Sequence, residues 1–585
     1  MVTIYQSKSE ENEILIENEG ETVQTFEHRQ SIDQSFAQTA TPPPDSKTVG
    51  KQDLSDNILT FLDNYQKDLK LNLSESNIQV SAVLGNIARL YERLRTLIEY
   101  KGEHVLRRNA IERILRRLVW EKESIKNSVD SKKISENLIR ELVWVRYLAN
   151  NSIPSSRISE VAKIIDKYFF LLKNLDNLPT GLSLSKVKKW LWGVASSEIE
   201  DLIDPSKKDL YINLMLDWFN SNFDWKDKGL SPKKREIQIY LAIHRSLVKS
   251  DEAIMRYYLL MKSFPGWGRS NEEDLYIFIN NFPEIFKNIE NDLNYPGRYY
   301  IFRKIQKHSP AFEIFRLITE KNSEIESLIS DRKKLNSSIK RVCEETYKKL
   351  KVKVNKGIIR SIFYIFLTKV LFAFLLEIPY EIYRFGDVRY TPLFINIALP
   401  PFMMWLISFS ITVPGAKNTQ LIIEKINTVI YKSENPVRYQ FSIGKNKGNP
   451  WLISIFGIFY TLLFFSVFGG ISFLLFKLNF SISGILVFFV FLSLVILFAF
   501  RIRYHASQLK VESEKEGFFS HLIGYLSLPF LNFGFYLSKG LSALNFFTVF
   551  LDFIIEAPLK NIIEIFEEWT LFIREKKEEV IEVPE

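Results

Sequence analysis

Side chains that commonly carry out chemistry or form cross-links are scarce in this chain of 585 residues, which has one cysteine, Cys343, and six histidines. A single cysteine excludes an internal disulfide and a cysteine-rich zinc site, and it indicates a reducing compartment for the domain that holds it. No two histidines have the spacing of paired metal ligands. The sequence therefore predicts neither a metal nor another cofactor.

Catalytic and nucleotide-binding motifs are missing as well. The chain has no G-x-x-x-x-G-K-[ST], no complete G-x-G-x-x-G, no H-E-x-x-H and no G-x-S-x-G. The stretch GWGRSN, which begins at Gly266, lacks the final glycine and is interpreted as a turn. Enzymatic activity is therefore not indicated, although a site built from scattered residues would escape this search.

The N-terminus has no secretory signal. Its first residues, MVTIYQSKSEENEILIENEGET, are acidic and polar, with no basic region, apolar region or cleavage site of the kind that signal peptides contain. We therefore expect a cytoplasmic N-terminus and no cleaved signal peptide. Residues 1–52 include the segment TATPPPDSK and are poor in aromatic side chains, which is typical of a disordered tail.

Residues 53–309 have the pattern of a helical domain. Apolar residues recur at spacings of three and four, as in SNIQVSAVLGNIARLYERLRTLIEY, and turn signals such as NNSIPSS and FPGWGRS separate the helical segments. No strand alternation and no fixed repeat period are visible. The sequence therefore predicts an all-α fold that begins with an irregular helical bundle on the cytoplasmic side.

Residues 310–357 are predicted to form a basic linker helix with weak coiled-coil character. Heptad-like spacing joins a few apolar residues with Arg332 at a core position, and the apolar residues are Ile325, Leu328, Leu335, Ile339 and Val342. The basic run KRVCEETYKKLKVKVNKGIIR then leads directly into an apolar segment. One helix is thus expected to enter the membrane.

Residues 358–555 contain runs of about twenty apolar residues, the length that a bilayer core ~30 Å thick requires. The four strongest candidates are residues 358–383, 392–413, 450–476 and 482–500. Two weaker ones, residues 518–537 and 541–555, would form either a full hairpin or a re-entrant one. We expect a multi-pass integral membrane protein with four to six spans, and the lipid bilayer is its first partner.

The orientation follows from the basic residues of the short loops, since lysine and arginine are enriched on the cytoplasmic side. The loops after the second and fourth spans hold most of them: Lys417, Lys425, Lys432, Arg438, Lys445, Lys447, Arg501, Arg503, Lys510 and Lys515. These loops, the helical bundle and the C-terminus should all face the cytoplasm. The net charge of +9 is then explained without nucleic acid.

Lys369 is a candidate functional residue because a charge inside an apolar span is costly and is usually kept for a purpose. It lies ~10 to 16 Å deep, and Glu377 lies ~12 Å further along a straight helix, which excludes a direct pair within that helix. Asp552 lies at a compatible depth on the last apolar segment, so we hypothesise a Lys369–Asp552 pair. In the alternative, Lys369 extends toward the cytoplasm and Asp552 lies near an interface.

Prolines interrupt two of the predicted spans, at Pro400-Pro401 and at Pro529. Broken spans in two halves of a chain can form a substrate site at the membrane midplane. Proline kinks are nevertheless common in membrane helices without any transport role. Both interpretations remain open at this stage.

An arginine cluster lies in the bundle and consists of Arg107, Arg108, Arg113, Arg116 and Arg117. Neighbouring glutamates dilute its charge and no aromatic residues interleave with it, so a nucleic-acid surface is not indicated. A solvated or salt-bridged face is the simpler interpretation. A basic surface for acidic headgroups or an acidic protein is the alternative.

Residues 556–585 are predicted to form an amphipathic acidic helix and tail. Its acidic face disfavours anionic lipid and favours docking on a basic protein surface.

Taken together, these patterns favour a membrane-anchored binding or scaffold protein that recruits a cytoplasmic protein partner through its helical domain. The alternative is a small transporter or channel that uses broken membrane helices together with Lys369 and Asp552. Either protein could form an oligomer.

Overall fold

The part of the chain that our computed structural model describes is almost entirely helical. The described residues are 51–69, 92, 103–123, 130–175, 181, 183–204, 208–226, 230–322, 324–432, 439–441, 450–511 and 518–543, with the isolated positions 565, 569, 572, 573 and 576. The predicted disordered tail, the span over residues 541–555 and the C-terminal helix lie outside these residues wholly or for the most part.

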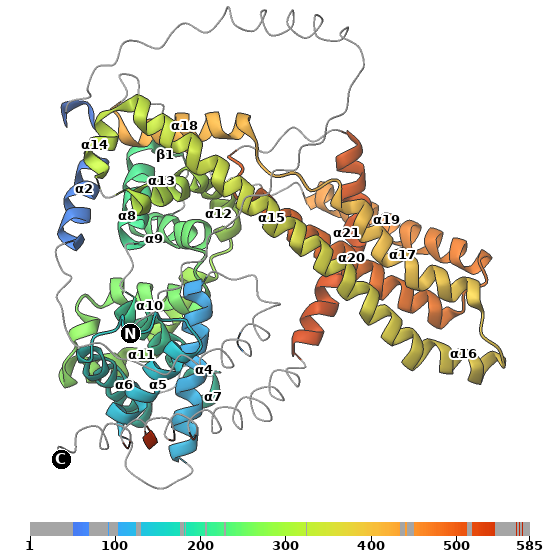
Figure 1. Cartoon of the computed structure of the whole chain (residues 1–585), viewed down its shortest axis with the longest axis horizontal. Helices are drawn as coiled ribbons and strands as arrows, with labels where there is room; N and C mark the ends of the chain where they lie inside the picture. The colour runs from blue at the N-terminus through green and yellow to red at the C-terminus, as the bar shows by residue number, and fades with distance from the viewer. Residues whose placement is uncertain are drawn as a thin grey trace, which may run out of the picture. The chain divides into compact units, whose positions relative to one another are not determined.

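The helices before the membrane segments are short to medium in length (Figure 1). They are α2 (Asp56–Leu69), α4 (Glu103–Glu123), α5 (Ser131–Trp144), α6 (Ser156–Asn174), α7 (Leu184–Ile203), α8 (Lys208–Asn222), α9 (Pro232–Ile243), α10 (Glu252–Ser263), α11 (Glu272–Leu293), α12 (Arg298–Gln306), α13 (Ser309–Lys321) and α14 (Ile325–Ser330). A π-helical segment, His244–Val248, continues α9, and 3₁₀ turns lie at Lys51–Asp53 and Trp267–Arg269.

The later helices are longer and more apolar. They are α15 (Arg332–Phe372), a π-helical segment (Ala373–Glu377), α16 (Ile378–Phe385), α17 (Tyr390–Ser408), α18 (Ala416–Ile430), α19 (Pro450–Lys477), α20 (Ile482–Ser507) and α21 (Phe518–Ala543). Of these, α16 and α18 are short and amphipathic.

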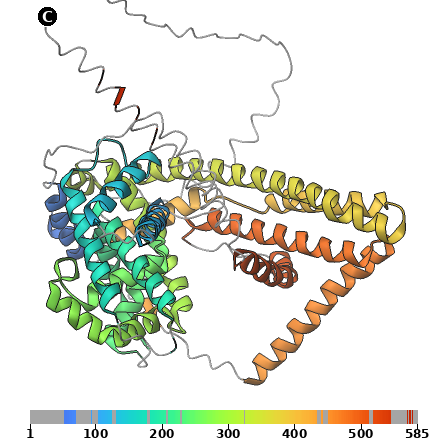
Figure 2. The same ribbon diagram turned by 90° about the horizontal axis from the view of Figure 1, so that it is seen from below.

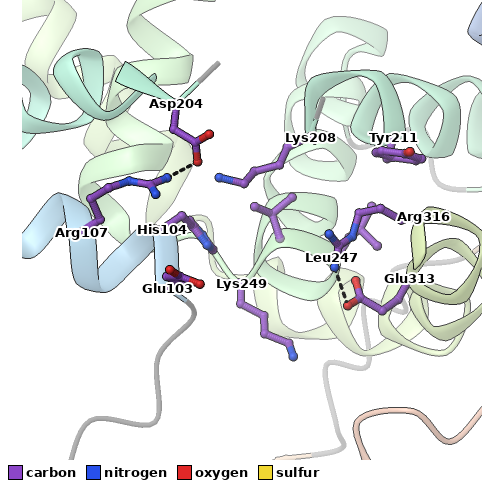
Figure 3. Close-up of a pocket in the computed structure, with 11 residues that line it drawn as sticks. Glu103, His104, Arg107, Asp204, Lys208, Tyr211, Leu247, Lys249, Glu313 and Arg316 are labelled. Atoms are coloured by element: carbon purple, nitrogen blue, oxygen red, sulfur yellow. Dashed lines mark hydrogen bonds and ion pairs between the residues drawn. The ribbon is translucent and has the colours of Figure 1, made fainter. Parts of the chain in front are cut away.

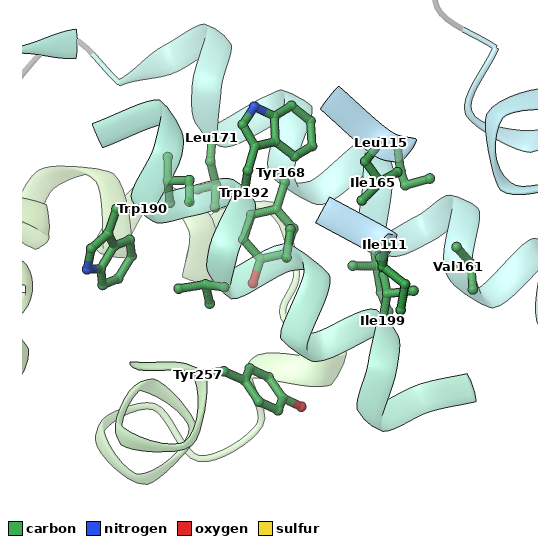
Figure 4. Packing of buried hydrophobic residues seen from close by; sticks show 14 of the residues in the cluster. Ile111, Leu115, Val161, Ile165, Tyr168, Leu171, Trp190, Trp192, Ile199 and Tyr257 are labelled. Carbon is green, nitrogen blue, oxygen red and sulfur yellow. The ribbon is translucent and has the colours of Figure 1, made fainter. Parts of the chain in front are cut away.

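A first hydrophobic core joins α4, α5, α6, α7, α10 and α11. Figure 4 shows how residues such as Ile111 and Leu115 on α4 meet Ile165 on α6, because spacings of three and four place them on one face of each helix. A buried carboxylate, Glu198, is satisfied there by donors that include the Tyr168 hydroxyl at 2.8 Å. This polar network is paired throughout, so it does not weaken the core.

A second hydrophobic core joins α2, α8, α9, α12, α13, α14, the first half of α15, and α18. Leu335, Ile339 and Val342, the residues with heptad-like spacing, are buried in it. The packing of the bundle therefore continues past residue 309, where the sequence pattern placed its end. These side chains pack into a globular core of many helices and not against one partner helix. The coiled-coil character of the linker therefore stays a prediction.

Two three-residue strands also contribute to this region. The strand β1 (Phe223–Trp225) pairs in parallel with β2 (Tyr439–Phe441), with Phe223 opposite Tyr439. Strand alternation needs more than three residues to be visible in a sequence, which explains why no strand was expected. The prediction of a helical fold class is nevertheless confirmed, since strands are almost absent from the described residues.

Four helical segments of the described chain are long and apolar enough to cross a membrane: Arg332–Phe385, Tyr390–Ser408, Ser454–Lys477 and Ile482–Ser507. They coincide with the four strongest candidates from the sequence. This finding supports an integral membrane protein. The weaker segment around Pro529 forms a single helix, α21, and is not among the four.

The membrane helices α15, α17 and α20 lie side by side, as both views show (Figures 1 and 2). A small core of α15, α17 and α20 side chains joins them, and a second one joins α19, α20 and α21. A Cβ added to Gly534 of α21 would lie 2.7 Å from the Ser493 carbonyl oxygen of α20, so this close approach requires glycine.

The prolines inside the membrane segments do not break their helices. Pro400 and Pro401 lie within α17, and Pro529 lies within α21. The interruptions that the sequence suggested are therefore not helix breaks among the described residues.

The packing of α18 against the second core yields a first prediction. Replacing Ile426, which is 1% exposed, with alanine should destabilise this core by about 2 to 5 kcal/mol, because the change leaves a cavity. The fully buried Cys343 belongs to the same core and reports its opening, so Ile426→Ala should accelerate maleimide labelling of this thiol in the full-length protein. Thr428→Ala, an exposed change on the same helix, should leave the labelling rate unchanged. Equal rates for the two variants would contradict the packing described.

Candidate functional site

Lys369 lies on α15 and is fully buried, with its Nζ 2.5 Å from Oε1 of Glu377. The separation along a straight helix had excluded this pair, and that exclusion was wrong. The chain between them changes from α-helix to π-helix at Ala373–Glu377, and both long side chains extend along the helix axis toward each other. A local change in helix geometry, which the sequence pattern did not reveal, thus supplies the partner.

Asn396 of α17 completes a group of three polar side chains. Its Nδ2 donates to the same Glu377 Oε1 at 2.9 Å, and the residue is 2% exposed. The Lys369 ammonium also lies 4.6 Å from the ring centroid of Phe491 on α20, within cation–π range. We call Lys369, Glu377 and Asn396 the intramembrane polar cluster.

A small cavity of about 20 Å³ adjoins this cluster, lined by Glu377, Asn396 and the serines Ser481 and Ser483 among others. This volume can hold one water molecule. The Asn396 Oδ1 is buried and has no hydrogen-bond partner in the described part of the chain. The cluster therefore has acceptor capacity left that its own residues do not use.

The hypothesised partner of Lys369, Asp552, lies outside the described residues. A Lys369–Asp552 pair therefore remains a prediction. It would have to form in addition to the Lys369–Glu377 pair, since the lysine has three donor hydrogens.

The arginine cluster of α4 is distributed over ion pairs. The Arg107 guanidinium donates to Glu200 at 2.7 Å and also pairs with Asp204, and the remaining four arginines each pair with a carboxylate. Arg107 and Arg108 are themselves buried, at 6% and 5% exposure. A role of the arginine cluster as a surface for an anionic partner remains a prediction. The paired carboxylates already neutralise much of the positive charge of these arginines.

A larger cavity lies between the two cores of the helical domain and has a volume of about 350 Å³ (Figure 3). We call it the bundle cavity. Its walls come from the start of α4, the end of α7, the start of α8, the His244–Val248 segment and α13. The polar residues that line it are Glu103, His104, Arg107, Asp204, Lys208, Lys249, Glu313 and Arg316.

The carboxylates of the bundle cavity are largely taken up by its arginines. Asp204 pairs with Arg107, and Glu313 accepts from Arg316 at 2.9 Å. Among the described residues, Lys208 reaches one carboxylate, that of Glu200 at 3.7 Å, which is held more closely by Arg107. The Lys208 ammonium therefore keeps donors available to a bound group.

His104 lines the same cavity and is held neutral. Burial, together with the charges of Lys208 and Arg107, lowers its pKa from 6.5 to about 3. Its Nε2 is buried and has no hydrogen-bond partner among the described residues. The cavity thus offers a neutral imidazole and an ammonium side by side, which suits a polar or anionic group.

Sequence patterns had singled out only one residue of this cavity, Arg107. Glu103 and His104 are its neighbours on α4, but Lys208, Lys249 and Arg316 come from distant segments. No motif joins residues so far apart, so no signal in a single sequence could have grouped them. Searches against protein-family models, curated proteins and solved structures found no match for this chain.

The intramembrane pair yields a second prediction. Lys369→Met alone, or Glu377→Gln alone, should destabilise the full-length protein by about 3 to 5 kcal/mol, because each leaves an uncompensated buried charge. The double variant should recover much of this loss. Thermal unfolding in detergent measures the double-mutant cycle, and Lys477→Met, at an exposed lysine of α19, is the control. Additive single effects would show that the two side chains do not interact.

The histidine of the bundle cavity, His104, yields a third prediction. In the folded state the pKa of His104 is about 3, and unfolding returns it to about 6.5, so only the unfolded chain takes up this proton between these pH values. Stability should therefore fall as the pH drops below 6.5, by about 2 kcal/mol from this group at pH 5. His104→Gln should show a smaller decrease in melting temperature between pH 7 and pH 5 than the wild type does. Lys188→Gln, on the exposed start of α7, should behave like the wild type, and an unchanged pH dependence in His104→Gln would contradict the assignment.

Proposed function

We propose that this chain is a multi-pass membrane protein whose helical domain lies in the cytoplasm and serves as a membrane-anchored binding or scaffold module. The observation that carries this proposal is the bundle cavity. Its volume of about 350 Å³ lies in the range of ligand-binding clefts, and its charged walls suit a polar partner.

The topology of the proposal is supported by the second core. Side chains from α18, which follows the second span, and Val511, which follows the fourth, pack with Leu335 and the bundle helices in that core. One hydrophobic core cannot lie on both sides of a bilayer, so these segments share a side. Their lysines and arginines favour the cytoplasm as that side.

The exposed surfaces of the candidate membrane helices suit contact with lipid. Large apolar side chains such as Phe363 of α15 and Phe465 of α19 are 65% and 68% exposed. Contiguous apolar surface of this kind is typical of a membrane or protein interaction site. The intervening loops around Gly386 and Asn479 would then face the other side of the bilayer.

The partner that fits the bundle cavity best is a cytoplasmic protein with an acidic side chain or segment. Lys208 and Lys249 would donate to its carboxylate or phosphate oxygens, and Arg316 of α13, which also lines the cavity, would add positive charge. Because Asp204 and Glu313 of the wall are already paired with arginines, they would repel such a group less than free carboxylates would.

A second candidate function is transport of a small ion or a proton through the membrane helices. It is favoured by the intramembrane polar cluster, because Asn396 has a buried oxygen without a partner beside a cavity of about 20 Å³. Against it, Lys369 is fully buried, and α17 and α21 continue through their prolines. The binding function therefore ranks first.

A charge reversal in the bundle cavity distinguishes these functions and is a fourth prediction. Full-length Lys208→Glu, crosslinked in its native membrane and then purified, should recover the cytoplasmic partner at least tenfold less than the wild type. Lys188→Glu makes the same change on an exposed helix start outside the cavity and should keep the partner. Melting temperatures of both variants serve as a check on folding.

Equal recovery from all three proteins would refute binding through this cavity. Ion or proton flux in liposomes that is lost in Lys369→Met, with unchanged partner recovery in Lys208→Glu, would instead support the transport function.

A further inference from the structure

A second cavity, of about 250 Å³, lies next to the bundle cavity where α15 and α20 meet the helical domain. We call it the juxtamembrane cavity. Its walls come from the His244–Val248 segment, the start of α13, α15 and the end of α20. The polar residues that matter below are Lys249, Ser309, Lys349, Lys353, His505 and Gln508.

The charge in this cavity is predominantly positive. Lys349 and Lys353 lie one turn apart on α15, an arrangement of like charges that destabilises a helix, and neither forms an ion pair within the described part of the chain. Glu313 is the one carboxylate among the described residues that line the cavity, and Arg316 already donates to it at 2.9 Å. Glu345, one turn before Lys349 on α15, interacts electrostatically with this lysine but forms its ion pair with Lys321, so the cavity keeps an excess of positive charge.

The third ammonium, that of Lys249, extends across the cavity to α20. Its Nζ donates to Oε1 of Gln508 at 2.7 Å, a neutral acceptor. Partial desolvation lowers the pKa of Lys249, the carboxylate of Glu313 acts in the opposite direction, and the charges of Lys353 and Arg316 lower it further. A bound anion would relieve this repulsion among the cations.

A buried serine also lines this site. Ser309 is 4% exposed and lines the cavity, and its Oγ has no hydrogen-bond partner among the described residues. Buried hydroxyls are normally paired, so an unpaired one beside several cations indicates a ligand oxygen. Ser309 is also the first residue of α13, and the amino end of a helix favours negative charge.

The position of the cavity along α15 indicates which anionic group would lie close to it. Lys353 lies four residues before Gly357, and apart from Val352 the large exposed apolar side chains of α15 begin at Ile359, which is 66% exposed. His505 lies in the last turn of α20, a second candidate span. The cavity is therefore at the level where two helices would enter the bilayer and where phospholipid phosphates lie.

We propose that the juxtamembrane cavity binds the phosphate group of an anionic ligand, with the headgroup of an anionic phospholipid as the source that its position favours. The ammonium groups of Lys249, Lys349 and Lys353 would pair with the phosphate oxygens, and the Ser309 hydroxyl would donate to one of them. The site goes beyond the proposed binding function, because it uses a different cavity and a different ligand.

The test uses full-length protein in nanodiscs and three variants. Lys349→Gln/Lys353→Gln removes two cations of the cavity, and Lys348→Gln/Lys351→Gln removes two exposed cations of the same helix that do not line it. Ser309→Ala removes the hydroxyl without changing any charge. Melting temperatures confirm that each variant folds.

Two probes separate the sources of phosphate. The first is phosphatidylglycerol in a phosphatidylcholine nanodisc, counted by native mass spectrometry as lipid that stays bound after transfer to detergent. The second is inorganic phosphate, measured by equilibrium dialysis in nanodiscs of phosphatidylcholine alone. Two lysines near a membrane surface contribute about 1 kcal/mol each to anion binding, so the cavity double variant should bind at least tenfold more weakly than the wild type.

A lipid headgroup site predicts that the wild type and the helix control keep bound phosphatidylglycerol. Ser309→Ala should then keep less of it, and the cavity double variant should lose it. Saturable inorganic phosphate binding with the same variant pattern, and no preference for phosphatidylglycerol, would support a site for a free phosphorylated ligand. If both probes bind the cavity double variant and the helix control equally, the attraction is a general property of the basic helix and the proposal is overturned. Loss of partner recovery in Lys208→Glu bears only on the bundle cavity, so the two proposals can fail separately.

Discussion

The second hydrophobic core is the constraint on which the rest of this structure depends. It gathers segments that the membrane spans separate in the sequence: the bundle helices, the first half of α15, α18 and Val511. Burying their apolar faces in one place requires all of them to lie on the same side of the bilayer. The same requirement makes α15 continue without interruption from the domain into the membrane, since its first half is buried in the core and its second half contacts α17 and α20.

Most buried charges among the described residues form ion pairs, and several of these pairs connect different helices; Glu381, which accepts a hydrogen bond from the Arg389 backbone N–H, is an exception. Arg107 connects α4 to the end of α7 through Glu200, and Glu377 connects α15 to α17 through Lys369 and Asn396. A buried charge without its partner is strongly unfavourable, so each pair selects one relative position of its helices. Among the buried polar atoms of the described residues that have no partner, Asn396 Oδ1 and Ser309 Oγ belong to residues that line cavities, so they mark places where a further group could bind.

Both π-helical segments of the described chain lie beside these polar sites. His244–Val248 leads to Lys249 on the wall shared by the bundle cavity and the juxtamembrane cavity, and Ala373–Glu377 positions Glu377 opposite Lys369. A π-helical segment inserts a residue into the helical repeat, which turns the side chains that follow it to a different face. In both places this shift directs a charged side chain toward a group it would otherwise miss.

Hydropathy, periodicity and loop charge, all properties of neighbouring residues, were enough to predict the helical fold class and the four strongest membrane segments, and they identified Lys369 as unusual. They could not identify Glu377 as its partner, because straight-helix arithmetic does not anticipate a π-helical segment. These properties could not group Lys208, Lys249 and Arg316 into one cavity. They could not group Ser309 with Lys349 and Lys353 either, since such residues meet only when distant helices pack. The sequence by itself therefore determined which segments are helical and which suit a membrane, because those depend on local composition and spacing. Only the tertiary structure decided which charges are paired and where cavities remain, because those depend on contacts between residues far apart in the chain.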